Sequence, residues 1–522
     1  YWFVKAERKA ALMVKNMKKA LINATIYKSE KQAILIEDNK ILIVGMNEDV
    51  LQQISDSDEV IDLNGMFVLP GFVDSHMHLV GLGFYLSCVQ LATCTSLKDM
   101  KERLLARLST LKQGQWLIAR GYNEETFTDA KVKPTKDFLD AISKDVPICV
   151  TRSCGHSMSC NTKALQLASM NESKDGIVEE MDINVVHEAW PKVDESTLID
   201  YIQKGIACAN AFGVTTVGSD DFLSICDSYE LPLNTFEKLS YQEKMNLRVN
   251  EQCEFNDVEE FSRFLDEGYT FDVGNDLFRI GPLKLVTDGS LGARSAAMSK
   301  PYHDAQDTTG IMNYSVEEMQ TFVQLANQFN MPTIAHCIGD RAVDDVLEAY
   351  AGNVYEGNPL HHGIVHCQIL RQDQIDQIIQ KKLSCYFQSI FLSTDAAIVE
   401  NRVGEALAKS SYPYKTLYEN TIASNGSDAP VEMPNALLGI ELAITRNGMH
   451  QEESLSVEQA IDSYTIKGAE QLFMQDRIGK IAPDYYADLV VLDTDITKVE
   501  ANQIHEAKVM MTFMNGEVVF ER

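Results

Sequence analysis

Apolar and polar residues alternate in short stretches at both ends of the chain. Alternation with a period of two predicts β-strands, which here occupy parts of residues 20–66 and 487–520. Turns separate these stretches, and Asn515-Gly516 is a dipeptide typical of a two-residue hairpin turn. We therefore expect one small, discontinuous β domain built from residues 17–66 and 475–522.

The long middle of the chain, residues 67–474, alternates apolar runs with amphipathic helical stretches such as residues 315–330. The apolar runs predict eight strands, which begin at Phe67, Val214, Leu247, Arg279, Met331, Gly363, Leu383 and Thr421. Strands that alternate with helices predict an α/β fold with parallel strands, and eight such units predict a (β/α)8 TIM-type barrel. In such a barrel, catalytic groups lie at the C-terminal ends of the strands.

The interval between the first two predicted strands is too long for a loop. We expect an inserted subdomain at about residues 80–210, with helices over residues 97–112 and 134–142 and a strand over 146–151. The first residues are basic and aromatic and lack the features of a signal peptide. Residues 1–16 are therefore interpreted as a leader or an upstream extension, outside the fold prediction.

The 522-residue chain is acidic, with 46 Lys and Arg against 76 Asp and Glu and a net charge of −30. This balance argues against nucleic acid or an anionic membrane as a partner, because both attract basic surfaces. No apolar run reaches the length needed to span a membrane. The 11 scattered cysteines are typical of reduced thiols rather than a disulfide framework. We expect a cytoplasmic protein that acts on a small molecule.

Two histidines end the first predicted barrel strand, where residues 69–78 have the sequence LPGFVDSHMH. Alternate side chains of an extended strand point to the same side, so His76 and His78 project together. This is the geometry that two imidazoles need to chelate one metal ion. The pair alone is a weak signal, because unrelated histidines at a strand end can have the same spacing.

Other potential ligands follow other predicted strands. The fourth strand carries a lysine, the fifth and sixth each carry a histidine, and the eighth ends in an aspartate: Lys284, His336, His366 and Asp428. Each has a structural alternative, since Lys284 could pair with a carboxylate and Asp428 could cap a turn. Their coincidence at one edge of one barrel predicts a metal site.

With these residues in view, the sequence resembles the amidohydrolase superfamily, and more closely its amidohydrolase-3 branch of YtcJ-like proteins, which includes N-substituted formamide deformylase. The resemblance covers the chain from about residue 18. Besides LPGFVDSHMH it rests on RSCGH (152–156) followed by Asn161, KLVTDGS (284–290), HCIGDRA (336–342), GSDAP (426–430) and ADLVVLD (487–493). The chain departs from the branch at Val365, where relatives often have Glu, and at residues 483–486, which replace a glycine-containing motif.

The resemblance implies a site for one or two divalent ions. His76, His78 and Asp428 would hold the more buried ion. Lys284, carboxylated by carbon dioxide, would bridge to a second ion held by His336 and His366. Zinc is the expected metal, because imidazole and carboxylate ligands suit it. A mononuclear site that uses part of this set stays open.

The resemblance also implies hydrolysis of an amide-type C–N bond in a small N-acyl compound or N-substituted formamide. Zinc lowers the pKa of bound water to about 7, which makes hydroxide available for attack on the carbonyl carbon. Asp428 would take the water proton and return it to the leaving nitrogen. A cyclic amide or ester hydrolase and a deaminase on the same barrel remain alternatives. A non-catalytic metal-binding protein also remains, although no expected ligand is missing.

Four further residues are candidates for contacts with the substrate. His156 is expected to have a catalytic role, as an oxyanion or substrate contact, with a structural role in the insertion as the alternative. Tyr122 belongs to a segment expected to line the pocket. Asp288 and Arg294 would contact the substrate or brace the loop after the fourth strand. The resemblance also leaves a homodimer open.

Overall fold

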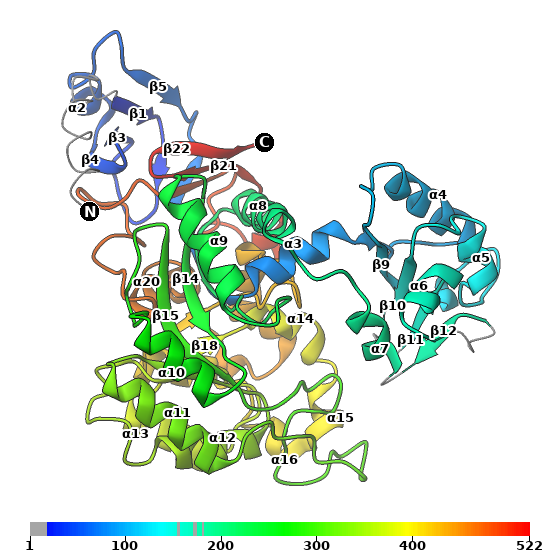
Figure 1. The fold of residues 1–522 in the computed structure, drawn as a ribbon. Helices are drawn as coiled ribbons and strands as arrows, with labels where there is room; N and C mark the ends of the chain where they lie inside the picture. The colour runs from blue at the N-terminus through cyan, green and yellow to red at the C-terminus, as the bar shows by residue number, and fades with distance from the viewer. Residues whose placement is uncertain (1–17, 154–156, 171–174, 180–181) are drawn as a thin grey trace. The chain divides into compact units, whose positions relative to one another are not determined.

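The structure is a computed structural model of the chain, and it describes residues 18–153, 157–170, 175–179 and 182–522. It divides into two compact units (Figure 1). Of the described residues, one unit contains 18–81 and 205–522, and the other contains those between 82 and 204. The helices α3 (Leu79–Ser87) and α8 (Glu195–Ala211) each run across the boundary between the units.

The larger unit contains an eight-stranded parallel sheet that forms a nearly closed barrel, which confirms the predicted α/β fold. Its strands are β7 (Phe72–Met77), β13 (Val214–Ser219), β14 (Arg248–Cys253), β15 (Phe278–Val286), β16 (Thr333–Cys337), β17 (Gly363–His366), β18 (Ser384–Phe387) and β19 (Ala423–Asn425). The main helices that connect and cover them are α9 (Glu230–Tyr241), α10 (Val258–Asp266), α11 (Val316–Gln328), α12 (Asp340–Tyr350), α13 (Gln372–Lys381), α17 (Tyr414–Asn420), α18 (Ala436–Thr445), α19 (Val457–Ser463) and α20 (Ile466–Gln471). Shorter helices after β18 are α14 (Leu392–Asp395), α15 (Val399–Val403) and α16 (Glu405–Ala408).

The barrel closes where the segment after β19 meets β7. The Asp428 N–H donates to the His76 carbonyl at 2.8 Å, and the His78 N–H donates to the Ala429 carbonyl at 2.8 Å. Gly426 lies at the closest approach, where a Cβ atom would be 2.6 Å from the His76 nitrogen. The glycine therefore allows the last strand to reach the first one.

The first apolar run forms two strands, so the barrel strand predicted to begin at Phe67 begins instead at Phe72. β6 (Phe67–Pro70) leaves the barrel and joins the terminal sheets, where it pairs with β20 (Leu489–Leu492). Gly71 lies between the two strands, and a Cβ atom there would clash with the Thr215 side chain on β13. The chain can bend this close to its neighbour only because position 71 has no side chain.

The two ends of the chain build two sheets side by side (Figure 1). Their elements are β1 (Lys18–Ile22), β2 (Thr25–Ile26), β3 (Ala33–Glu37), β4 (Lys40–Gly45), α2 (Asn47–Leu51), β5 (Glu59–Asp62), β6, β20, η5 (Ala501–Glu506), β21 (Val509–Met514) and β22 (Glu517–Glu521). Residues Asn515 and Gly516 both have positive φ, as the predicted hairpin turn between β21 and β22 requires. One apolar core contains Ile34 and Ile36 from the start of the chain and Leu489 from its end. Neither end can bury its apolar face without the other.

The smaller unit, residues 82–204, has its own five-stranded sheet in the order β12-β11-β10-β9-β8. Its elements are β8 (Val89–Gln90), α4 (Leu97–Leu108), β9 (Leu117–Tyr122), η1 (Glu124–Thr126), α5 (Lys136–Asp140), β10 (Ile148–Arg152), β11 (Ser157–Cys160), α6 (Thr162–Leu167), β12 (Ile177–Glu179) and α7 (Asp182–Glu188). The sequence predicted α4, α5 and β10 but not β8, β9, β11 and β12. Across the described parts of both units, every helix is too short or too polar to cross a bilayer.

A buried ion pair ties the barrel to the C-terminal sheet. Arg248, at the start of β14, donates from Nε and Nη2 to the Asp488 carboxylate at 2.8 and 3.2 Å. The two side chains are 2% and 3% exposed. The Tyr486 ring covers the guanidinium at 4.1 Å, and the Asn515 N–H donates to Asp488 at 2.8 Å. Because water cannot reach either charged group, each needs the other to offset the energetic cost of its burial.

We expect Asp488→Ala to lower the free energy of unfolding by about 3–5 kcal/mol, because it leaves the Arg248 charge buried without a partner. Urea unfolding followed by circular dichroism measures this loss. The control is Glu405→Ala, which breaks a solvent-exposed ion pair with Lys409 and should leave the free energy of unfolding nearly unchanged. Equal losses in the two variants would contradict the bracing role of Asp488.

Candidate metal centre

Three side chains with metal-binding atoms meet at the seam between β7 and β19. The Asp428 Oδ1 atom lies 3.1 Å from His78 Nε2 and 3.4 Å from His76 Nε2. One ligand atom from each of these residues lies within 4.8 Å of the other two. His76 and Asp428 are buried, whereas His78 is partly exposed. This group could hold a metal ion.

The remaining predicted ligands lie next to this group. The His366 ring centre is 5.6 Å from that of His76 and 4.4 Å from that of His336. Lys284 is buried, and its Nζ atom lies 3.4 Å from His76 Nε2 and 3.2 Å from Asp220 Oδ2. The fold thus brings together four histidines, one lysine and one aspartate from five strands of the barrel.

The four imidazoles share one hydrogen-bonding pattern: each Nδ1 atom faces an oxygen. The pairs are His76 with Gln252 Oε1 (2.6 Å), His78 with the Asp220 carbonyl (2.9 Å), His336 with Asp288 Oδ1 (2.8 Å) and His366 with Gln388 Oε1 (2.7 Å). Both glutamine amides are oriented by N–H groups that donate to backbone carbonyls. Since these oxygens can only accept, each Nδ1 carries a hydrogen, and Nε2 is the ring atom available to a metal.

The charges at the seam also favour a cation. Burial alone would lower the pKa of His78, but the hydrogen bond and charge of Asp428 raise it to about 9. Burial and the nearby Lys284 charge lower the pKa of His76 to about 4. Burial would raise the pKa of Asp428, yet its hydrogen bonds to His76 and His78 hold it well below the usual carboxyl range. The carboxylate therefore attracts positive charge to the space between these imidazoles.

Two of the candidate ligands have strained backbones. His366 has a φ of 82° and Asp428 a φ of 56°, both in the left-handed region that favours glycine. For a residue other than glycine, such a backbone conformation costs on the order of 1–3 kcal/mol. Residues in this conformation are most frequent at functional sites. At Asp428 the strained backbone is held by the bond to the His76 carbonyl and by the Val431 N–H, which donates to the Asp428 carbonyl at 2.8 Å.

Asp288 lies against a histidine rather than in open space. Its Oδ1 atom receives His336 Nδ1 and the Ile338 N–H, and its Oδ2 atom receives the N–H groups of Ala297 and Gly339 at 3.0 and 2.8 Å. With both oxygens engaged, the carboxylate orients the His336 ring. Its expected contact with the substrate stays a prediction.

The other predicted residues lie in different surroundings. Arg294 donates to Asp304 at 3.0 and 2.9 Å, and both residues lie in the loop after β15. Tyr122 is buried in the core of the smaller unit, where its ring stacks on Phe127 at 6.2 Å. His156 lies outside the described residues. Substrate contact by Tyr122 and Arg294 stays a prediction.

The sequence analysis missed three residues that hold the candidate ligands. They are Asp220, after β13; Gln252, within β14; and Gln388, after β18. The sequence held one signal, since Gln252 is a polar amide within a predicted barrel strand. The structure shows that all six residues of this strand are buried. Such a side chain needs a hydrogen-bonding partner inside the barrel.

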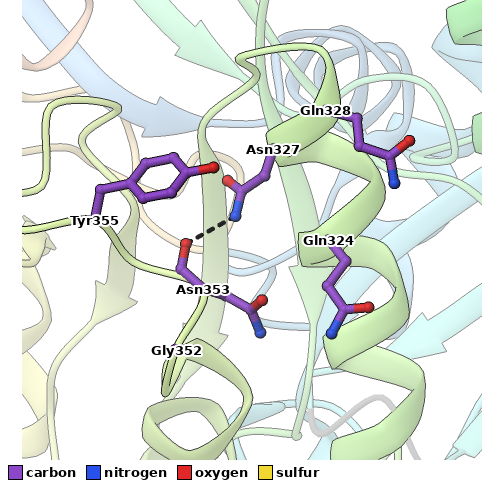
Figure 2. A pocket seen from close by; sticks show the side chains of 6 residues that line it. All are labelled: Gln324, Asn327, Gln328, Gly352, Asn353 and Tyr355. Atoms are coloured by element: carbon purple, nitrogen blue, oxygen red, sulfur yellow. Dashed lines mark hydrogen bonds between the residues drawn. The ribbon is translucent and has the colours of Figure 1, made fainter.

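A pocket of about 230 Å³ opens at the opposite end of the barrel, where α11 ends (Figure 2). It is lined by Gln324, Asn327, Gln328, Gly352, Asn353 and Tyr355. The Asn327 amide donates to the Asn353 carbonyl at 2.7 Å across it. Because α11 returns from the C-terminal to the N-terminal ends of the strands, this pocket is remote from the metal centre. Its amide groups supply neither a nucleophile nor a proton carrier, so the chemistry is assigned to the metal centre.

The fold and the cluster at its strand ends define a metal-dependent hydrolase of the TIM-barrel type. The chain belongs to the amidohydrolase family, whose model matches residues 59–520. This confirms the resemblance seen in the sequence motifs.

Similar proteins of known sequence or structure extend this assignment. The chain is 29% identical to the putative amidohydrolase YtcJ of Bacillus subtilis, over 94% of this chain and 96% of that protein. It is 22% identical to the N-substituted formamide deformylase of Arthrobacter pascens, over 94% and 95% of the two chains. The structure of an uncharacterized metal-dependent hydrolase from Pyrococcus furiosus matches with a TM-score of 0.80 and 28% identity, covering 92% of this chain and all of that one.

We expect Gln252→Leu to weaken metal binding by about ten- to a hundredfold, because the His76 ring loses the partner that fixes its orientation. Competition with a chromophoric chelator measures the affinity. Gln242→Leu, at an exposed position after α9, is the matched control and should bind like the wild type. An unchanged affinity in Gln252→Leu would show that this hydrogen bond does not support the ligand.

Proposed function

We propose that the protein is a zinc-dependent hydrolase that cleaves an amide-type C–N bond in small N-acyl compounds or N-substituted formamides. The observation that carries this proposal is the common orientation of the four imidazoles, each with its Nδ1 atom engaged by an oxygen, beside the Asp428 carboxylate. The similarity to an N-substituted formamide deformylase supports the choice of bond.

The donor set fits zinc, which prefers imidazole nitrogen and carboxylate oxygen. His76, His78 and Asp428 would hold one ion. A divalent ion held there would acidify water and supply hydroxide near neutral pH. Asp428 would accept the proton of the attacking water as the C–O bond forms, and would then return it to the nitrogen so that the C–N bond breaks and the amine leaves.

Lys284 has a separate role in the proposal. An ammonium group cannot bind a cation, but a neutral lysine that reacts with carbon dioxide becomes a carbamate with two ligand oxygens. The Nζ atom lies 3.4 Å from His76 Nε2, so a carbamate would extend into the cluster of imidazoles. We infer that it bridges to a second ion held by His336 and His366.

Asp428→Asn tests the proposed proton transfer. We expect kcat to fall by about a hundred- to ten-thousandfold, since general acid–base catalysis contributes about that factor. Release of formate and amine from N-benzylformamide by the zinc-loaded protein measures the rate, and thermal unfolding verifies the fold. Wild-type protein that binds zinc fully but hydrolyses neither formamides nor N-acyl amines would contradict the proposed function. Retained activity in Asp428→Asn would contradict the assigned proton carrier alone.

Lys284→Ala tests the bridging lysine. We expect loss of activity and of part of the bound metal, with partial rescue by added short carboxylates such as acetate. Wild-type protein incubated with isotope-labelled bicarbonate should show a carbamate signal in its carbon NMR spectrum, and the variant should not. The control is Lys467→Ala, which removes a lysine on α20 that pairs with Glu470. Full metal content in Lys284→Ala would show that the lysine is not a ligand.

A further inference from the structure

A fully buried glutamate on β14 contacts the loop that holds the His78 ring. Glu251 is 0% exposed, and its Oε1 atom accepts the Asp221 N–H at 2.9 Å. Its Oε2 atom has no hydrogen-bond partner among the residues that the structure describes. Burying a carboxyl group costs free energy. The bond between Glu251 and the Asp221 backbone is therefore a contact for which the fold pays, beside a candidate metal ligand.

The peptide group between Asp220 and Asp221 connects Glu251 to His78. Its N–H, from Asp221, donates to Glu251, and its carbonyl, from Asp220, accepts from His78 Nδ1 at 2.9 Å. A trans peptide group is planar and rigid, so its N–H and C=O bonds point in opposite directions. An acceptor that fixes the N–H therefore also fixes the direction of the carbonyl. That carbonyl in turn determines how the His78 ring is oriented.

The residues on both sides of this peptide group are tied to the chain that follows His78. The Ser219 Oγ atom accepts the Leu79 N–H at 2.8 Å, and the Asp221 Oδ1 atom accepts the Val80 N–H at 2.7 Å. These donors are the first N–H groups of α3, which have no partners within the helix itself. The loop after β13 and the segment that contains His78 are thus fixed to each other.

Neighbouring residues of β14 contact the two histidines of β7 by different routes. The Gln252 amide accepts directly from His76, whereas Glu251 reaches His78 through a peptide group. Successive residues of a strand point to opposite faces, so only one of the two side chains can enter the barrel. The other side chain, Glu251, acts from the outer face on the loop that follows the neighbouring strand.

We propose that Glu251 is a positioning residue of the metal centre, which holds the His78 imidazole through the peptide group between Asp220 and Asp221. This role requires an oxygen acceptor at the reach of a glutamate side chain, not a negative charge. Burial, together with the Asp221 charge, raises the pKa of Glu251 well above the usual carboxyl range, which favours a neutral group at this position. The proposal rests on metal binding by His78 within the proposed function, and not on which bond is cleaved.

Two substitutions separate the acceptor from the charge. Glu251→Gln keeps an oxygen at the same reach without a charge, and its zinc affinity should stay close to that of the wild type. Glu251→Asp keeps the carboxyl group but withdraws it by one methylene group, and zinc should bind about tenfold more weakly. Competition with a chromophoric chelator measures both affinities. Wild-type affinity in Glu251→Asp, or an equal loss in the two variants, would overturn the proposal.

Glu260→Asp is the matched control. Glu260 is 6% exposed and its Oε2 atom also accepts a backbone N–H, from Asn256 at 2.8 Å, but it lies on α10 rather than on a barrel strand. Shortening it weakens a comparable bond, and its zinc affinity should equal that of the wild type. Thermal unfolding gives the loss of stability in each variant. If Glu260→Asp loses as much zinc affinity as Glu251→Asp, general destabilisation explains the effect and the proposal is wrong.

A double-mutant cycle with His78→Ala tests whether Glu251 acts through this ligand. Without the His78 ring, Glu251→Asp should not weaken zinc binding by the remaining ligands any further, as measured with a chelator of lower affinity. A second loss of about tenfold in the His78→Ala background would overturn the proposal. No substrate is used in these measurements. Failure of the wild type to hydrolyse formamides would therefore contradict the proposed reaction and leave the test of Glu251 intact.

Discussion

Closure of the barrel between β7 and β19 is the constraint on which the candidate site depends. Two backbone hydrogen bonds join His76 to Asp428 and His78 to Ala429, and the Asp74 carboxylate accepts the Ser427 N–H at 3.0 Å across the same seam. The candidate ligands are therefore residues of the seam itself. A shift of one residue in β7 would turn both histidines away from Asp428. Folding the barrel and assembling the ligands are one event.

The terminal sheets extend this constraint to the ends of the chain. β6 pairs with β20, with Leu489 opposite Pro70, and Gly71 joins β6 directly to β7. The same C-terminal segment carries Asp488, whose buried pair with Arg248 fixes the start of β14, the strand that holds Gln252. Both partners of the contact between His76 and Gln252 thus lie on strands anchored by the last residues of the chain. This explains why a hydrolase barrel includes a β domain distant from its chemistry.

The sequence predicted those features that depend on the local pattern of residues and on the order of the strands along the chain. Alternation and strand–helix repeats indicated the barrel, and the spacing of His76 and His78 indicated a shared direction. The start of the first barrel strand was wrong because both halves of the run around Gly71 are apolar, so periodicity does not show where the chain leaves one sheet for another. The partners of the histidines were missed because Gln252 lies 176 residues from His76, and only the tertiary fold pairs them.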